Sequence, residues 1–270
     1  MNRLGFGAMR ITGKGVWGPP ADHDECIRVL RRAVELGVNF IDTADSYGPY
    51  VSEELIREAL HPYPDDVVVA TKAGLVRTGP DEWSPLGYPP YLRQECEMSL
   101  RRLGTDCIDL YQLHRIDAKF PLEDQLGELV ALQREGKIRH LGLSEVTVDQ
   151  LAAAQQHATI ASVQNMYNLT VRTSEALLDK VTEESIAFIP WFPLASGPLA
   201  AADGPLQRIA AEHHATPSQL ALAWLLKRSP VVLPIPGTSS VAHLEENVAA
   251  ATITLSDEEF DTLSKAGAGG

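Results

Sequence analysis

Short apolar segments alternate with amphipathic segments along almost the whole chain of 270 residues, and this alternation restricts the possible folds more than any other feature. The apolar segments have the length and composition of buried strands. We predict eight strands, at residues 4–9, 38–42, 67–72, 108–114, 138–144, 161–166, 186–191 and 231–235. We predict eight helices, at residues 26–36, 52–60, 91–103, 122–135, 148–157, 174–183, 217–227 and 241–249.

Repeated strand–helix units predict parallel strands joined by right-handed crossovers, and eight units are the number that closes a barrel. We therefore expect an α/β fold, a single-domain (β/α)8 TIM barrel over residues 1–266, with a flexible C-terminal tail at 267–270. The main alternative is an open, doubly wound sheet. Such a sheet usually binds a dinucleotide through a G-x-G-x-x-G turn, and the candidate at residues 5–10, GFGAMR, lacks the third glycine.

The composition narrows the class of protein. A net charge of −13 disfavours a nucleic-acid-binding surface. The three cysteines, Cys26, Cys96 and Cys107, form no C-x-x-C pair, which favours a reduced, cytoplasmic compartment.

No segment has signal-peptide form or membrane-spanning length, so we expect no membrane association. No H-x-H or H-E-x-x-H spacing occurs, and we predict no metal site. The sequence leaves the oligomeric state open and slightly favours a monomer.

Polar residues stand at the ends of three consecutive predicted strands. Asp42 ends the second, Lys72 the third and His114 the fourth, and Tyr47 lies in the loop after Asp42. Each residue alone has an ordinary structural explanation, as a turn cap, a packed aromatic, a partly buried cation or a core histidine. Active sites of such barrels lie at the carboxyl ends of the strands, so the four together predict one catalytic site.

These side chains could protonate a carbonyl oxygen. An ammonium about 4 Å from a phenolate stabilises it by about 4 kcal/mol at an effective dielectric of about 20, so we expect Lys72 to lower the pKa of Tyr47. Asp42 would keep Lys72 charged and in place, and His114 could donate a hydrogen bond to the same oxygen. The hydride for the carbonyl carbon would have to come from a cofactor.

Two long loops follow strand ends, at residues 11–24 and 73–90. They contain aromatic residues among prolines and glycines, which suggests rigid walls around a pocket, although aromatic residues that only close the surface would fit the pattern as well. The predicted substrate-pocket residues are Met9, Trp17 and Trp83.

Three motifs make the chain resemble the aldo-keto reductase family over essentially its whole length. They are NFIDTADSYG at residues 39–48, ATK at 70–72 and DLYQLH at 109–114. The resemblance implies that Tyr47 is the general acid, that Lys72 and Asp42 tune it, and that His114 orients the substrate. GPP at residues 18–20 and GTSSVAHL at 237–244 are similar to bacterial members, some of them called pyridoxal reductases.

The resemblance also implies a nicotinamide cofactor, NADPH, with NADH possible. The implied contacts are with the carboxamide, the nicotinamide ring, the adenosine phosphate and the adenine. The residues are Ser144, Glu145, Gln164, Trp191, Phe192, Pro193, Leu194, Gly237, Thr238, Ser239, His243, Glu246 and Asn247. Without the resemblance, the segment after residue 235 could equally be an anion site at a helix N-terminus or a capped surface helix.

The chain departs from the family pattern inside this cofactor set. Glu145 stands where the family usually has asparagine, and an ionised carboxylate can only accept hydrogen bonds. We expect it to bind the carboxamide nitrogen but not its oxygen. Gly237 and His243 stand where many members have a lysine and an arginine for the 2′-phosphate, which weakens the preference for NADPH over NADH.

The leading hypothesis is an NADPH-dependent reductase of small aldehydes or ketones. One alternative is a Schiff-base barrel lyase with Lys72 as the nucleophile. Another is a nicotinamide-nucleotide-binding redox sensor or subunit with feeble turnover.

Overall fold

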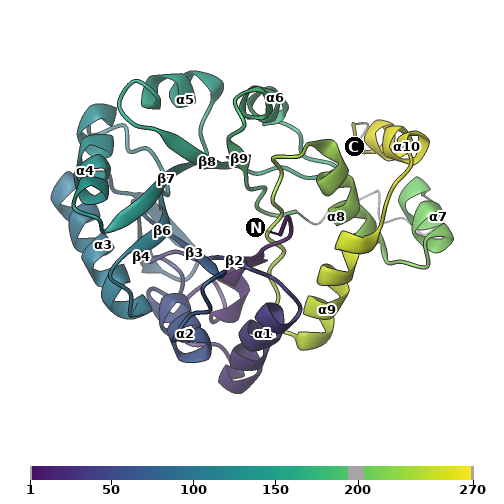
Figure 1. The fold of residues 1–270 in the computed structure, drawn as a ribbon, viewed down its shortest axis with the longest axis horizontal. Coiled ribbons are helices and arrows are strands. Elements are labelled where there is room, and N and C mark those ends of the chain that lie inside the picture. The colour runs from purple at the N-terminus through teal and green to yellow at the C-terminus, as the bar shows by residue number, and fades with distance from the viewer. Residues whose placement is uncertain (1, 194–203, 269–270) are drawn as a thin grey trace.

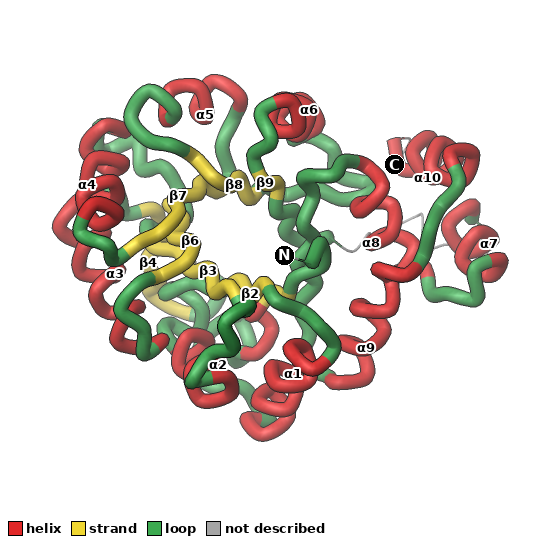
Figure 2. The backbone as a smooth tube through the Cα atoms, in the orientation of Figure 1, coloured by secondary structure: helices red, strands yellow, loops and turns green. Residues whose placement is uncertain are grey.

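The computed structural model describes residues 2–193 and 204–268. Seven parallel strands curl into an incomplete ring in which each strand pairs with the next one along the sheet, and helices surround the ring (Figures 1 and 2). The strands are β1 (Phe6–Gly7), β2 (Phe40–Asp42), β3 (Val68–Ala73), β6 (Ile108–Leu113), β7 (Ile138–Ser144), β8 (Ile160–Gln164) and β9 (Ala187–Phe188).

The helices lie mainly between consecutive strands in the chain. They are α1 (His23–Glu35), α2 (Val51–Leu60), α3 (Pro89–Leu103), α4 (Leu122–Arg134), α5 (Val148–Ala154), α6 (Glu175–Glu183), α7 (Pro205–Glu212), α8 (Pro217–Arg228), α9 (Val241–Ala249) and α10 (Asp257–Ala268). Two short 3-10 helices are η1 (Ala8–Ile11) and η3 (Ala250–Thr252). The architecture confirms the predicted single-domain (β/α)8 barrel.

The eighth predicted strand closes the ring without regular strand pairing. The amide of Leu233 donates to the carbonyl of Phe188 at 2.8 Å, and the amide of Gly5 donates to the carbonyl of Pro234 at 2.9 Å. Pro234 and Pro236 have no amide hydrogen, so this segment cannot donate a full set of ladder hydrogen bonds. The prediction of a strand at 231–235 was therefore right in position and wrong in regularity.

The long loop after β3 contains a β-hairpin that the sequence did not predict. Its strands are β4 (Leu75–Gly79) and β5 (Glu82–Pro85), which pair antiparallel. Arg77 of β4 donates hydrogen bonds to the carbonyls of Gly15, Val16 and Ser46, and its guanidinium lies 3.5 Å from the centre of the Trp83 ring. This one side chain therefore ties the hairpin to the first long loop and to the loop that carries Tyr47.

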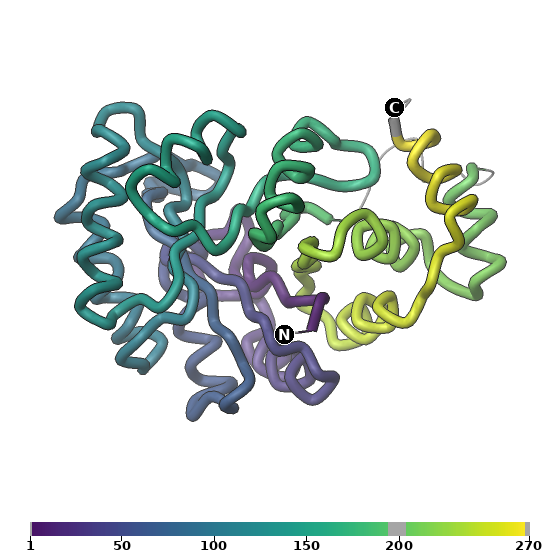
Figure 3. The backbone as a smooth tube through the Cα atoms, turned by 45° about the horizontal axis from the view of Figure 1, so that its top comes forward, coloured from purple at the N-terminus to yellow at the C-terminus, as the bar shows by residue number. Residues whose placement is uncertain are grey.

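Helices α7 and α10 were also missed. Phe260 of α10 stacks on Trp224 of α8 with an interplanar angle of 11°, and the Trp224 indole nitrogen donates to the hydroxyl of Ser264 at 2.8 Å. Figure 3 shows α10 beside α7 and α8 at the edge of the barrel. Neither helix is followed by a strand of the ring, so strand–helix alternation gave no signal for them. None of the described helices is long and apolar enough to cross a membrane.

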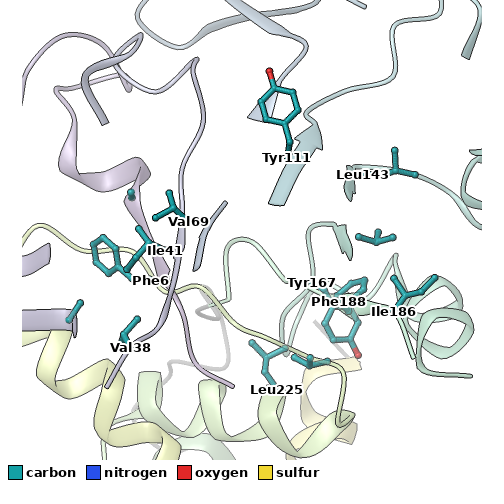
Figure 4. Packing of buried hydrophobic residues seen from close by; sticks show 14 of the residues in the cluster. Phe6, Val38, Ile41, Val69, Tyr111, Leu143, Tyr167, Ile186, Phe188 and Leu225 are labelled. Carbon is teal, nitrogen blue, oxygen red and sulfur yellow. The ribbon is translucent and has the colours of Figure 1, made fainter. Parts of the chain in front are cut away.

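The strands divide their side chains between two environments because successive residues point to opposite faces. Residues such as Ile41, Val69 and Tyr111, which alternate with the inward-facing ones, belong to the main buried apolar cluster, part of which Figure 4 shows. Inward-facing residues form a separate apolar layer inside the barrel. This inner layer consists of Phe40, Ala70, Leu110, Ile189, Leu233 and Ile235.

On three of these strands, the next inward-facing residue is polar. Asp42, Lys72 and Gln112 follow Phe40, Ala70 and Leu110, respectively, by two residues. The buried polar layer therefore lies next to the apolar layer, toward the carboxyl ends of the strands. Active sites of TIM-barrel enzymes lie at this end of the barrel.

Candidate active site

Asp42 and Lys72 form a buried ion pair in the polar layer. The Lys72 ammonium donates to Asp42 Oδ2 at 2.7 Å, to the Thr43 carbonyl at 2.7 Å and to the Tyr47 hydroxyl at 3.5 Å. Burial acts to lower the pKa of Lys72, but the charge and hydrogen bonds of Asp42 and Tyr47 outweigh it, so the pKa is raised. The ammonium stays charged beneath Tyr47.

Two amide side chains complete the shell around Asp42. Gln112 Nε2 donates to Asp42 Oδ1 at 3.2 Å, and Gln164 Nε2 donates to the same oxygen at 2.8 Å. Together with Lys72, they fix the carboxylate from both of its oxygens. Gln164 was predicted as a cofactor contact, and its amide nitrogen is used here to hold Asp42. The role of Gln112 was not predicted.

His114 lies beside Tyr47, with ring centroids 5.9 Å apart. Its Nδ1 is 3.3 Å from the Ser46 hydroxyl. Burial lowers the pKa of His114 well below its ordinary value, and the nearby Lys72 and Arg115 charges lower it further. The ring is therefore neutral at physiological pH and can donate one hydrogen bond while accepting another.

Lys72 acts to lower the pKa of Tyr47, as expected, but the net pKa of Tyr47 is nevertheless raised. Burial raises the pKa of Tyr47 above the ordinary value of a phenol, and the opposing effect of Lys72 does not overcome it. The reason is that the hydroxyl lies in a site where the phenolate loses most of its hydration. Tyr47 is consequently protonated in the resting protein, a state that would allow it to donate a proton. Lys72 would act on the charge that develops during proton transfer.

Buried carboxyl groups lie in and next to the loop that carries Tyr47. Asp45 is 2% exposed, and burial, together with the charges of Glu53 and Glu95, raises its pKa well above the ordinary value of a carboxyl group. Arg102 pairs with Glu53 at 2.5 Å and lies 3.5 Å from Glu95. Arg102 thus contacts two of these three carboxyl groups, and the raised pKa of the third, Asp45, favours its protonated form.

A pocket of about 640 Å³ opens above the polar layer and includes Tyr47 and His114 in its lining. Of the predicted substrate-pocket residues, Met9 and Trp83 line it. Trp17 is not among the lining residues and packs instead against Arg77, whose guanidinium lies 5.7 Å from its ring centre. The described residues contain no group of three or more His, Cys, Asp or Glu side chains that could hold a metal ion.

Glu145 is engaged by the protein itself. Its Oε1 accepts hydrogen bonds from the Trp191 indole at 2.5 Å and from the amide of Met166 at 2.7 Å. The backbone of Glu145 has φ +53°, a left-handed conformation that non-glycine residues adopt at some cost. The carboxylate therefore joins the loops after β7, β8 and β9 and fixes the edge of Trp191.

The remaining nicotinamide-side predictions mostly lie at the pocket. Ser144, Gln164, Trp191, Phe192 and Pro193 line it. Leu194 lies outside the described residues. Ser144 accepts a hydrogen bond from Arg115 at 3.1 Å, an interaction the sequence did not predict.

The predicted adenosine-side residues extend from the pocket onto helix α9. Gly237 lines the pocket, and Thr238 accepts a hydrogen bond from the amide of Ser240 at 3.1 Å. Ser239, His243 and Glu246 are exposed, whereas Asn247 is buried. Glu25 of α1 accepts a hydrogen bond from the amide of Val241 at 3.0 Å, so a carboxylate already uses one N-terminal amide of α9.

The site can accommodate a nicotinamide nucleotide. The pocket is within the usual range of about 300–1,000 Å³ for small-molecule sites, and it combines an aromatic wall with hydroxyl and amide groups next to Tyr47. Arg10 lies at the same pocket, and a Cβ on Gly237 would be 3.5 Å from its side chain. A cation is therefore present near the predicted phosphate segment although Gly237 and His243 replace the usual basic residues.

A parallel barrel with a buried Asp–Lys pair beneath a tyrosine at a pocket is suited to proton transfer, and comparison with known proteins shows the family. The aldo/keto reductase family model matches residues 3–268. The chain belongs to this family, which confirms the predicted resemblance, and it is therefore an oxidoreductase of a family that uses NADP(H).

Two curated relatives and one solved structure illustrate the similarity. The uncharacterized oxidoreductase C215.11c of Schizosaccharomyces pombe is 57% identical over 267 residues, covering 99% of this chain and 87% of the relative. Pyridoxine 4-dehydrogenase of Escherichia coli is 46% identical, covering 97% and 94%. An aldo-keto reductase from Klebsiella pneumoniae in complex with NADPH is 30% identical and superposes with a TM-score of 0.83, covering 98% and 90%.

Proposed function

We propose that the protein reduces small aldehydes or ketones with NADPH, and that Tyr47 donates the proton. The observation that carries the proposal is the Tyr47 hydroxyl, 3.5 Å from the buried Lys72 ammonium at a pocket it shares with His114. When bound, the nicotinamide supplies a hydride to the carbonyl carbon. A proton from Tyr47 to the carbonyl oxygen completes the alcohol.

Each neighbouring residue has a role in that proton transfer. The neutral His114 ring directs a hydrogen bond to the carbonyl oxygen and so orients it toward Tyr47. As the phenolate forms, the Lys72 charge stabilises it. Asp42, held by Gln112 and Gln164, keeps Lys72 in position. The apolar pocket wall excludes water, which strengthens these electrostatic interactions.

The cofactor would extend from this pocket to α9. We propose that Ser144, Trp191, Phe192 and Pro193 contact the nicotinamide end. The phosphate and adenine would be held by the set Gly237, Thr238, Ser239, His243, Glu246 and Asn247. NADPH rather than NADH is supported by the Klebsiella pneumoniae neighbour in complex with NADPH and by Arg10 at the pocket. NADH remains the alternative, and the cytoplasmic location and the oligomeric state remain predictions.

The proposed substrates are small carbonyl compounds, with pyridoxal as the first candidate. Its support is the similarity to a protein named pyridoxine 4-dehydrogenase, because oxidation of pyridoxine at that carbon and reduction of pyridoxal are the two directions of one reaction. The mostly apolar wall of the pocket suits an aromatic ring.

The Schiff-base lyase is not supported by the site. A lysine nucleophile must lose its proton and reach the substrate. Lys72 is completely buried, and Asp42 and Tyr47 keep its pKa raised. The redox-sensor alternative rested on the similarity of some family members to redox-sensing subunits and on Glu145 in place of the usual asparagine. One oxygen of Glu145 is here hydrogen-bonded to the Trp191 indole and to the Met166 amide, so this carboxylate has a role within the pocket wall that does not require a sensor function.

The proposal is tested by fluorescence titration with NADPH and NADH, followed by turnover measurements with a panel of aldehydes that includes pyridoxal. We expect tighter binding of NADPH and multiple turnovers with at least one aldehyde. Tighter NADH binding would overturn the choice of cofactor. Tight nucleotide binding with only a slow single turnover for every aldehyde would favour the sensor.

Glu145 provides a separate prediction about the pocket wall. Glu145→Ala removes the acceptor of the Trp191 indole, so we expect the indole ¹H–¹⁵N resonance of Trp191 to move and NADPH binding to weaken by about 10-fold. Glu145→Gln keeps an acceptor oxygen at the same reach and should leave both quantities nearly unchanged. If Glu145→Ala leaves the indole resonance in place, the hydrogen bond does not position Trp191. The resonance is assigned with Trp191→Phe.

A further inference from the structure

Arg115 places a positive charge at the pocket beside the reacting groups. It follows His114 directly after β6 and lines the pocket together with Tyr47 and Ser144. Its Nη1 group donates to the His114 carbonyl at 2.6 Å and to the Ser144 hydroxyl at 3.1 Å. These two contacts fix one end of the guanidinium next to the position proposed for the carbonyl substrate.

The charge of Arg115 is not matched by a carboxylate in the described residues. Both of its acceptors are neutral, and no described Asp or Glu oxygen lies within 4.0 Å of it. Its Nε and Nη2 groups donate to no described residue. A guanidinium remains charged under these conditions and presents a planar set of donors that suits an anionic oxygen. By contrast, Arg93 and Arg228 are each paired with two carboxylates.

The other charged groups near the pocket leave Arg115 available. Asp42 is held by Lys72, Gln112 and Gln164. Glu145 is held by Trp191 and Met166, and its more distant charge partly offsets the effect of burial, which lowers the pKa of Arg115. Asp81 lines the pocket from the β4–β5 turn and is exposed. The described carboxylates therefore leave the guanidinium available to an incoming anion.

We propose that Arg115 binds an anionic oxygen on the carbonyl substrate and so selects aldehydes that carry such an oxygen over aldehydes that do not. The inference rests on the proposed reductase function and specifies its substrate class. Two sources share this chemistry, a ring oxide next to the aldehyde, as in pyridoxal, and a carboxylate elsewhere on the substrate. A bidentate contact with a guanidinium gives a directional preference that a lone ammonium does not.

Matched pairs of aldehydes distinguish these sources. The first pair is pyridoxal and its 3-O-methyl ether, and the second is 4-carboxybenzaldehyde and its methyl ester. We expect the protein to prefer the anionic member of at least one pair by about 10- to 100-fold in kcat/KM. The pair that shows the preference identifies the source of the anion. Arg115→Gln should abolish the preference, and Arg115→Lys should retain part of it.

The affinity for NADPH separates this role from a cofactor contact. Because Arg115 touches Ser144, it could instead hold the nicotinamide carboxamide. We expect the dissociation constant of NADPH in Arg115→Gln to stay within about threefold of the unchanged protein. Weakening of NADPH binding as large as the loss of anion preference would overturn the proposal. So would an equal response of the charged and neutral aldehydes to Arg115→Gln.

Equilibrium binding decides the inference even if the proposed function fails. The product alcohols of the same four aldehydes are titrated into the protein at saturating NADP⁺, with and without Arg115→Gln. Binding that favours the anionic alcohol and depends on Arg115 supports the inference, and binding without that dependence overturns it. Absence of turnover for all four aldehydes would count against the proposed function alone.

Discussion

Tyr47→Phe is expected to lower kcat for aldehyde reduction by about 10³-fold while the dissociation constant of NADPH changes by less than about threefold. The substitution removes the hydroxyl that lies 3.5 Å from the Lys72 ammonium and leaves the ring in place. Without it, no described side chain at the pocket is both protonated at neutral pH and supported by a buried cation. Steady-state kinetics with the best aldehyde and a fluorescence titration measure the two quantities.

Tyr111→Phe is the matched control for this experiment. The Tyr111 hydroxyl is also buried, but it has no hydrogen-bond partner in the described part of the chain, and its side chain belongs to the main apolar cluster and not to the inner layer. Its removal should leave kcat within about twofold. An unchanged kcat in Tyr47→Phe would refute Tyr47 as the proton donor.

Lys72→Met is expected to have the largest effect on stability. It leaves Asp42, 1% exposed, without its cation, and it removes the donor to the Thr43 carbonyl. Breaking a buried ion pair from one side typically costs about 3–5 kcal/mol in the free energy of unfolding. Urea unfolding measures this loss.

The double variant Asp42→Asn/Lys72→Met separates charge from packing. Because neither buried charge remains, we expect it to recover about 2 kcal/mol or more of the stability lost in Lys72→Met. It should recover none of the activity, since no ammonium remains to stabilise the Tyr47 phenolate. A double variant as unstable as Lys72→Met would show that lost packing, not an unpaired charge, explains the destabilisation.

Local sequence patterns predicted the parts of the fold in which residue types alternate regularly. Alternation of apolar and amphipathic segments predicted the barrel, and inward-facing positions two residues apart carry Phe40 and Asp42, or Ala70 and Lys72. The signals failed where the pattern is interrupted. Pro234 and Pro236 prevent a regular eighth strand, and the β4–β5 hairpin lies inside a segment rich in turn-forming residues.

Some residues of the candidate site could likewise be predicted from the sequence, and others could not. Asp42, Tyr47, Lys72 and His114 could be singled out because each stands at or just beyond the end of a predicted strand. Arg115 directly follows the DLYQLH motif, and its position one residue beyond a predicted strand end was the signal that could have indicated it. Arg77 gave no such signal, because its acceptors in the first long loop are about 60 residues away in the chain.

The sequence by itself determined the barrel, the family and the strand ends that carry polar side chains, because side-chain alternation and strand order fix which residues face inward. Only the tertiary structure decided the protonation states of the site residues and their hydrogen-bond partners. The pKa of Tyr47 rises because burial outweighs Lys72. Glu145 holds Trp191, 46 residues away, rather than standing free for a cofactor. These outcomes depend on distances and solvent exclusion between residues far apart in the chain.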